Sequence, residues 1–344
     1  MPRARDPVVD LKRIGFLLEA AQEPGYRVRA FRSAAAAVGR LDPTDLAARA
    51  AAGTLRELPG IGEVTERTIL ESLRGEEPVY LRRLEAVGAT PLAEGAAELR
   101  AALRGDCHVH TEASDGGASI REMAESAIEL GHAYVVITDH SPRLTVANGL
   151  SPERLRAQLE EIEALNAELS PFRLLTGIEV DINEDGSLDQ EPELLARLDV
   201  VVGSVHSALR SEERAMTVRM VTALANPHLD ILGHCTGRMK TGKRTRPPSA
   251  FDADLVFAAA ARFDKAIEVN SRPERLDPPK RLLRLAVEAG CRVSIDSDAH
   301  APGQLFWLGN GCARAFLCGV TAPMIVNMLE ADELLAWTAS HGAA

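Results

Sequence analysis

The segment Cys107-His-Val-His110 ends a short apolar run with two histidines, and several later apolar runs end in a similar way. In a β-strand, side chains two residues apart point to the same side, so His108 and His110 can hold one metal ion together. The other runs end in histidines and carboxylates as well. These endings are Thr138-Asp-His140, Gly177-Ile-Glu179, Gly203-Ser-Val-His206, Gly233-His234 and Asp296-Ser-Asp-Ala-His300.

The apolar runs are predicted strands, and helical patterns such as residues 152–169 and 279–289 lie between them. Buried strands that alternate with helices indicate a parallel sheet, and about seven such units favour a barrel over an open sheet. The predicted fold class is therefore α/β. The strands are expected at residues 107–109, 133–138, 174–180, 200–205, 229–232, 266–269 and 292–295.

The carboxyl ends of all strands in a barrel meet on one face, so six histidines and several carboxylates should converge there. An isolated core histidine is usually a hydrogen-bonded structural residue, and we assign His132, His228 and His341 to that class. Six imidazoles buried together would be costly without a shared partner. Because imidazoles and carboxylates are ligands of zinc, manganese and iron, the sequence predicts a metal site.

Charge divides the chain into two parts. Residues 1–100 hold 15 basic and 15 acidic residues, whereas the remaining 244 hold 24 and 35 and carry the whole net charge of −11. All nine histidines lie at or after position 108. Together with the small residues and proline that follow Gly88, this predicts an N-terminal domain at 1–87, a linker at 88–104 and a histidine-rich domain at 105–340.

The first domain is predicted to be helical throughout, with Leu58-Pro-Gly-Ile-Gly62 between two short helices. Glycines let the backbone approach a ligand closely, and free amides at the start of the next helix can hold a phosphate. We therefore expect Gly60 and Gly62 to contact a phosphate group. The upstream basic residues expected to assist are Arg27, Arg29 and Arg32. Because the domain has no net charge, we expect weak binding.

Pro59-Gly-Ile-Gly62 resembles a helix-hairpin-helix motif, and residues 11–84, including Tyr26-Arg-Val-Arg-Ala-Phe-Arg32, resemble the N-terminal domain of family X DNA polymerases. Lyase-active members carry a lysine on the helix after the hairpin, but Val64-Thr-Glu-Arg-Thr68 has none. A polymerase palm does not fit in the predicted linker. The resemblance implies sequence-independent DNA binding, without lyase or polymerase activity in this domain.

The histidine and carboxylate endings resemble the PHP (polymerase and histidinol phosphatase) domain over residues 104–338, above all that of bacterial family X polymerases. This resemblance implies a distorted (β/α)7 barrel, the PHP fold, and three divalent ions, manganese or zinc, with iron as a third option. It implies one ion on His108, His110, Glu179 and Asp298, a second on Glu179, His206 and His234, and a third on Asp115, His140 and His300. His206 is also expected to act in catalysis.

A basic loop follows His234. Arg238-Met-Lys-Thr-Gly-Lys-Arg-Thr-Arg246 holds five cations in nine residues of an acidic domain. Such runs are commonly solvated loops. Because this one is expected near the metal face, phosphate binding is an equally good interpretation. We expect Arg238 to contact substrate phosphate in catalysis, and Lys243, Arg244 and Arg246 to contact DNA. Asn270 is a further catalytic candidate, and Arg272 a weaker one.

Clustered divalent cations suit the hydrolysis of phosphate esters. We expect a phosphoesterase that acts on DNA 3′ ends, as a 3′-5′ exonuclease, a 3′-phosphatase or both. The main alternative is a small-molecule phosphatase of the histidinol-phosphatase type. An amidohydrolase-type enzyme is disfavoured because no strand end carries the lysine that usually bridges its metals, and a non-catalytic module because every ligand position is filled. Five cysteines, an odd number without a C-x-x-C pair, and the lack of a membrane span favour the cytoplasm.

Overall fold

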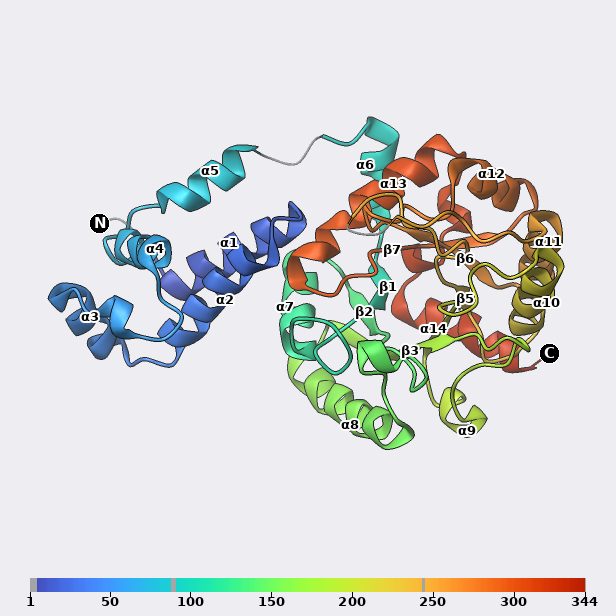
Figure 1. Ribbon diagram of the computed structural model, residues 1–344, viewed down its shortest axis with the longest axis horizontal. Helices are drawn as coiled ribbons and strands as arrows, with labels where there is room; N and C mark the ends of the chain where they lie inside the picture. Colours follow the sequence, from blue (N-terminus) through green and yellow to red (C-terminus); the bar gives the residue numbers. More distant parts are fainter. Residues whose placement is uncertain (1–4, 88–90, 243–244, 344) are drawn as a thin grey trace. The chain divides into compact units, whose positions relative to one another are not determined.

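The computed structural model describes residues 5–87, 91–242 and 245–343. They divide into two compact units, Met1–Pro91 and Leu92–Ala344 (Figure 1). Each unit has a hydrophobic core of its own. Within the described ranges, every helix is too short or too polar to cross a membrane.

The first unit is built from helices. Asp6 and Asp42 accept hydrogen bonds from the backbone N–H groups of Val8 and Thr44, which fixes the starts of two of these helices. Leu11, Ile14, Leu18, Phe31 and Ile69 belong to its buried core. The helices are α1 (Pro7–Ala20), α2 (Gly25–Gly39), α3 (Pro43–Ala52), α4 (Glu63–Leu73) and α5 (Val79–Val87), with the 3-10 turn η1 (Leu55–Glu57) before α4.

The second unit contains a seven-stranded parallel sheet in which every strand pairs with its neighbours in the sequence. The outer strands approach each other at Val109 and Ala299, and the His110 N–H donates to the Ala299 carbonyl at 2.8 Å. The sheet is thus a nearly closed barrel, and the predicted fold class is confirmed. The strands are β1 (Gly105–Val109), β2 (Tyr134–Ile137), β3 (Arg173–Asp181), β4 (Val200–Ser204), β5 (Ile231–Leu232), β6 (Ala266–Asn270) and β7 (Arg292–Asp296).

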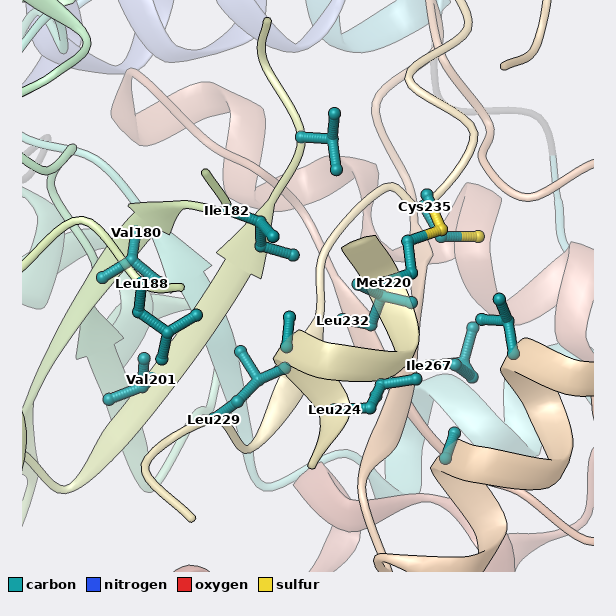
Figure 2. Packing of buried hydrophobic residues seen from close by; sticks show 14 of the residues in the cluster. Val180, Ile182, Leu188, Val201, Met220, Leu224, Leu229, Leu232, Cys235 and Ile267 are labelled. Atoms are coloured by element: carbon teal, nitrogen blue, oxygen red, sulfur yellow. The ribbon is translucent and has the colours of Figure 1, made fainter. Parts of the chain in front are cut away.

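Helices surround the strands (Figure 1). Figure 2 shows part of the largest core, in which Val180, Val201 and Leu232 of the sheet belong to one cluster with Met220 and Leu224 of a covering helix. The helices are α7 (Ile120–Glu129), α8 (Pro152–Leu169), α9 (Pro192–Leu195), α10 (Glu213–Leu224), α11 (Ala253–Arg262), α12 (Lys280–Glu288), α13 (Leu308–Leu317) and α14 (Ala331–Ser340).

Apolar packing fills the amino-terminal end of the barrel. Tyr134, Val200 and Ala266, at the starts of β2, β4 and β6, share a cluster with Leu334 and Trp337 of α14. The opposite end, where the strands finish, carries the histidines and carboxylates. The barrel therefore separates a packed end from a polar face, as parallel barrels with a site at the carboxyl ends do.

The segment predicted as a linker, 88–104, departs from that expectation. Residues Glu94–Ala102 form helix α6, which packs against α13 of the second unit, with Ala96 fully buried. Alanine and glutamate are strong helix formers, and their preference outweighs the scattered glycines on which the linker prediction rested. Residues 88–90 lie outside the described structure.

Candidate metal centre

Six histidine rings form one continuous cluster at the carboxyl ends of the strands. The ring centroids of His110 and His300 lie 4.2 Å apart, and those of His110 and His140 lie 4.4 Å apart. On the other side, His206 lies 5.3 Å from His234 and 5.4 Å from His140. His108 completes the set at 5.0 Å from His110. The structure therefore brings together the six histidines that the sequence analysis placed at strand ends.

Glu179 lies at the centre of this cluster. It is 1% exposed at the end of β3, and His140, which follows β2, pairs with it as a parallel bridge. One carboxylate oxygen, Oε1, lies 2.9 Å from His234 Nε2 and 3.3 Å from His206 Nε2. The other, Oε2, lies 2.7 Å from His140 Nδ1 and 3.5 Å from His108 Nε2. Such contacts let one carboxylate bridge more than one cation.

Asp115 and Asp298 flank the cluster. Asp115 Oδ1 lies 3.4 Å from His300 Nε2 and 3.5 Å from His140 Nε2, while Asp298 Oδ1 lies 3.5 Å from His110 Nε2. Asp115, Glu179 and five of the histidines form three groups whose ligand atoms lie close enough to hold an ion. The groups are His110, Asp115, His140 and His300; His108, His110 and Glu179; and His140, Glu179 and His206.

These groups resemble the expected division among three ions but do not reproduce it. His110 and His140 each occur in two groups, whereas the expected division used each of them once. Asp298 and His234 lie beside the groups, through their contacts with His110 and Glu179. All nine expected ligands are therefore within one connected cluster, and their assignment to individual ions stays a prediction.

The donor atoms of the cluster suit a divalent metal. His108 Nε2, both ring nitrogens of His110, His234 Nδ1 and Glu179 Oε2 are buried and make no hydrogen bond within the described structure. Buried polar atoms without a partner are costly, and a shared cation would satisfy several of these at once. The residues present thus fit the metal ions that the sequence analysis expected.

Protonation differs within the cluster. Burial would lower the pKa of His108 and His206, but nearby carboxylates outweigh it and raise both, that of His206 to about 9. Three other residues favour the metal-binding forms. Burial would raise the pKa of Glu179, but the surrounding imidazoles outweigh it and hold the pKa well below its ordinary value. Burial, reinforced by His300 and His140, lowers the pKa of His110 well below its ordinary value. Burial also lowers the pKa of His234. An ionised carboxylate and neutral imidazoles are the forms that bind metal.

A second layer of buried polar groups holds the ligands in place. Glu268, fully buried on β6, lies 2.6 Å from His108 Nδ1 through Oε1, and its Oε2 accepts a hydrogen bond from the His234 backbone N–H. Asp181 accepts a hydrogen bond of 3.1 Å from the His206 backbone N–H. Such partners orient metal ligands and fix their tautomers. Neither residue was predicted from its sequence pattern, although an acidic residue inside a buried strand is itself a signal.

Two of the three predicted catalytic residues are hydrogen-bonded to protein groups, and their catalytic roles stay predictions. Asn270 is fully buried, and its amide donates to Glu268 Oε2 at 3.2 Å and to Asp298 Oδ2 at 3.1 Å. The Arg238 guanidinium donates to the backbone carbonyls of Arg275 and Leu276. Asn270 therefore orients carboxylates, and Arg238 supports the loop after β6. The third candidate, His206, lies inside the cluster.

The expected DNA contacts lie in two places. In the first unit, Gly60 has a φ of 89° and is exposed like Gly62, while Arg27 pairs with Glu23, Arg32 pairs with Glu19, and Arg29 is exposed. In the second unit, Arg246 forms an antiparallel bridge with Met239 and donates from Nε to the Gly237 carbonyl. Lys243 and Arg244 lie outside the described residues. Their roles in DNA binding stay predictions.

Residues 106–272 match the family model of the PHP domain. The second unit contains a PHP domain. The chain is 46% identical over 198 residues to the DNA polymerase/3'-5' exonuclease PolX of Bacillus subtilis, a match that covers 58% of this chain and 34% of that protein. The chain thus spans about a third of the length of this relative. It is also 27% identical over 233 residues to a probable phosphatase of Thermoanaerobacter sp. (strain X514), covering 64% of this chain and 89% of that protein.

Among solved structures, the chain resembles the histidinol phosphate phosphatase of Lactococcus lactis complexed with zinc, L-histidinol and phosphate. The TM-score is 0.49 at 18% identity, over 63% of this chain and 94% of that one. The PHP domain, the phosphatase relatives and the cluster of histidines and carboxylates support a metal-dependent phosphoesterase.

Proposed function

We propose that this protein hydrolyses phosphate esters at DNA 3′ ends, as a 3′-5′ exonuclease, a 3′-phosphatase or both. The observation that carries the proposal is the convergence of nine potential ligands on one face of the barrel, in a chain that also holds a separate helical unit with an exposed Gly60–Gly62 turn. The identity to a relative named as a 3'-5' exonuclease supports DNA as the substrate.

The proposed division of labour follows from the chemistry of each side chain. His108, His110, Glu179 and Asp298 would hold one ion, Glu179, His206 and His234 a second, and Asp115, His140 and His300 a third. Bound divalent ions lower the pKa of a coordinated water and neutralise phosphate oxygens. The metal ligands would be kept in place by Glu268, Asp181 and Asn270. The protein would then not need to rearrange when the phosphate ester binds.

The helical unit would contribute binding and no chemistry. Gly62 directly precedes α4 and is exposed, which leaves the backbone at this helix start open to a phosphate oxygen. Its own N–H donates to Thr65 Oγ1 at 2.9 Å, so the amides that follow it in α4 are the candidate phosphate donors. This contact would be independent of base sequence, because it involves the DNA backbone alone.

A small-molecule phosphatase is the second candidate. It is favoured by the probable phosphatase of Thermoanaerobacter, which matches this chain over 89% of its own length. A small phosphate monoester would need the metal face alone. On this alternative, the exposed turn of the first unit would have no role in turnover.

A substrate panel separates the two candidates. Labelled single- and double-stranded DNA with 3′-hydroxyl or 3′-phosphate ends would be compared with small phosphate esters, including histidinol phosphate, in the presence of manganese, zinc or iron. We expect a higher kcat/KM on at least one DNA 3′ end than on every small ester. Efficient hydrolysis of a small ester with all DNA ends left intact, under every metal, would contradict the proposal.

A further inference from the structure

Two arginines on the segment that follows β6 point at the metal-binding side chains. Arg275 Nε lies 3.2 Å from Asp298 Oδ2. Arg272 Nη1 lies 3.6 Å from Asp298 Oδ1 and 3.2 Å from His300 Nδ1. Their side chains are 15% and 22% exposed, so both guanidinium groups are largely withdrawn from water at the edge of the site.

The backbone that carries these arginines is held firmly. The Arg275 N–H donates to the Arg272 carbonyl at 2.9 Å, and the next residue, Leu276, has a φ of 46°. Arg238 donates to the carbonyls of both Arg275 and Leu276 and so braces the turn from the neighbouring loop. The positions of the two guanidinium groups are therefore built into the loop, as a preformed binding site requires.

The two guanidinium groups have more donors than the protein uses. Arg275 Nη1 is buried and has no hydrogen-bond partner within the described residues. The two Nε groups have only ion-pair contacts there, with Asp298 at 3.2 Å for Arg275 and with Glu274 at 3.6 Å for Arg272. Asp298 cannot satisfy them all, since its Oδ2 already accepts a hydrogen bond from Asn270 and its Oδ1 faces His110. Buried cationic donors without partners are costly. A guanidinium fork with free donors matches the oxygens of a phosphate.

We propose that Arg275, assisted by Arg272, binds the phosphoryl group of the substrate next to the metal ligands. This inference rests on the proposed phosphoesterase function, but it is the same for a DNA end and for a small ester. It assigns to Arg275 the phosphate contact that the sequence analysis gave to Arg238. A purely structural role for Arg275 would instead be to hold Asp298, and that role would be visible in metal binding.

Inorganic phosphate is the probe, because it carries the recognised group without the rest of either substrate. Its affinity for the manganese-loaded full chain would be measured by calorimetry for the wild type, Arg275→Gln, Arg275→Lys and Arg272→Gln, with Arg281→Gln on the exposed face of α12 as the matched control. Metal content after removal of free ion, and the circular dichroism spectrum, would be recorded for each protein.

We expect Arg275→Gln to bind phosphate about 10- to 100-fold more weakly, as the loss of a charge-assisted contact predicts. Arg275→Lys should recover part of the affinity, Arg272→Gln should show a smaller loss, and Arg281→Gln none. Metal content should be unchanged throughout. The inference would be overturned if both Arg275 variants bound phosphate as the wild type does, or if the loaded wild type bound no phosphate. It would also be overturned if a loss of metal accounted for the loss of phosphate binding. Failure to cleave DNA, with the phosphate result as expected, would contradict only the proposed DNA substrate.

Discussion

Glu268 contacts two expected ligands of the candidate centre: its carboxylate lies beside the His108 ring and accepts a hydrogen bond from the His234 backbone N–H. The sequence analysis identified all the histidines in the cluster because strand ends are marked by the end of an apolar run. It missed Glu268 because this contact joins residues 160 positions apart in the sequence, and no local pattern records which side chains meet inside a barrel. The residues of the cluster were predictable from the sequence, whereas the contacts that support them were not.

A Glu268→Gln substitution should weaken metal binding. The neutral amide no longer attracts the His108 ring as a carboxylate does, so the imidazole is held less firmly and is less basic toward a cation. We expect the affinity for manganese to fall by about 10- to 100-fold. Competition with a chelating indicator measures this, and Glu288→Gln at the exposed end of α12 is the matched control. Equal affinity in Glu268→Gln and wild type would show that Glu268 does not support the ligands.

The buried histidine His132, which lies outside the metal cluster, should make the free energy of unfolding depend on pH. Burial, with Arg100 nearby, lowers its pKa from 6.5 to about 3, so the folded protein keeps it neutral where the unfolded chain takes up a proton. The free energy of unfolding should therefore fall as the pH decreases from about 6.5 toward 3, and this residue should account for about 2 kcal/mol of the loss by pH 5.

Urea unfolding of wild type and His132→Gln at pH 7.5 and pH 5.0 tests this assignment. The stability difference between the two proteins should shift in favour of the variant at the lower pH, because glutamine cannot be protonated. An identical difference at both pH values would mean that His132 is not the titrating group.

At the scale of elements, each of the seven predicted strands overlaps an observed strand, and the predicted helix at 152–169 coincides with α8. The shortest strand shows the limit: residues 229–232 were predicted, but only Ile231–Leu232 pair with their neighbours. An apolar run indicates that a segment is buried, but the length of a strand depends on its hydrogen bonds to adjacent strands. Helix α6 was missed because the glycines of residues 88–104 were given more weight than the helix preference of the alanines and glutamates there.

The turn before α4 allows a test that separates DNA binding from folding. A Cβ on Gly62 would have open space around it, whereas a Cβ on Gly60 would lie 3.0 Å from Ser33 Cβ at a φ of 89°. Gly62→Val should therefore weaken DNA binding with little change in stability, and Gly60→Val should also destabilise the first unit. Hydrolysis of a small chromogenic phosphate ester should be unaffected by Gly62→Val.

Fluorescence anisotropy with labelled DNA, together with thermal unfolding, measures both effects. The account of this turn would be wrong if Gly62→Val left DNA affinity intact. It would also be wrong if Gly62→Val removed DNA binding and ester hydrolysis together, since the turn would then support the catalytic unit.

On the scale of the whole molecule, a long polyanion that contacts the turn and the basic loop should bind in a strongly salt-dependent manner. Each phosphate contact releases counterions, so the rate of DNA cleavage at low substrate should fall steeply with salt, while that of a small ester should fall little. Changing Lys243, Arg244 and Arg246 to Ala should reduce the salt slope by up to about one unit per lost phosphate contact. Equal slopes for DNA and ester would argue against an extended DNA contact.

The number of metal ions per chain tests the central claim, that nine side chains on one face of the barrel form a phosphoesterase centre. The full chain would be saturated with manganese or zinc, separated from free ion, and analysed for metal and protein in the same sample. We predict three ions per chain in the wild type and a clear loss, together with loss of hydrolysis, in His234→Ala with its fold retained. One ion or fewer per chain in the wild type would contradict the assignment.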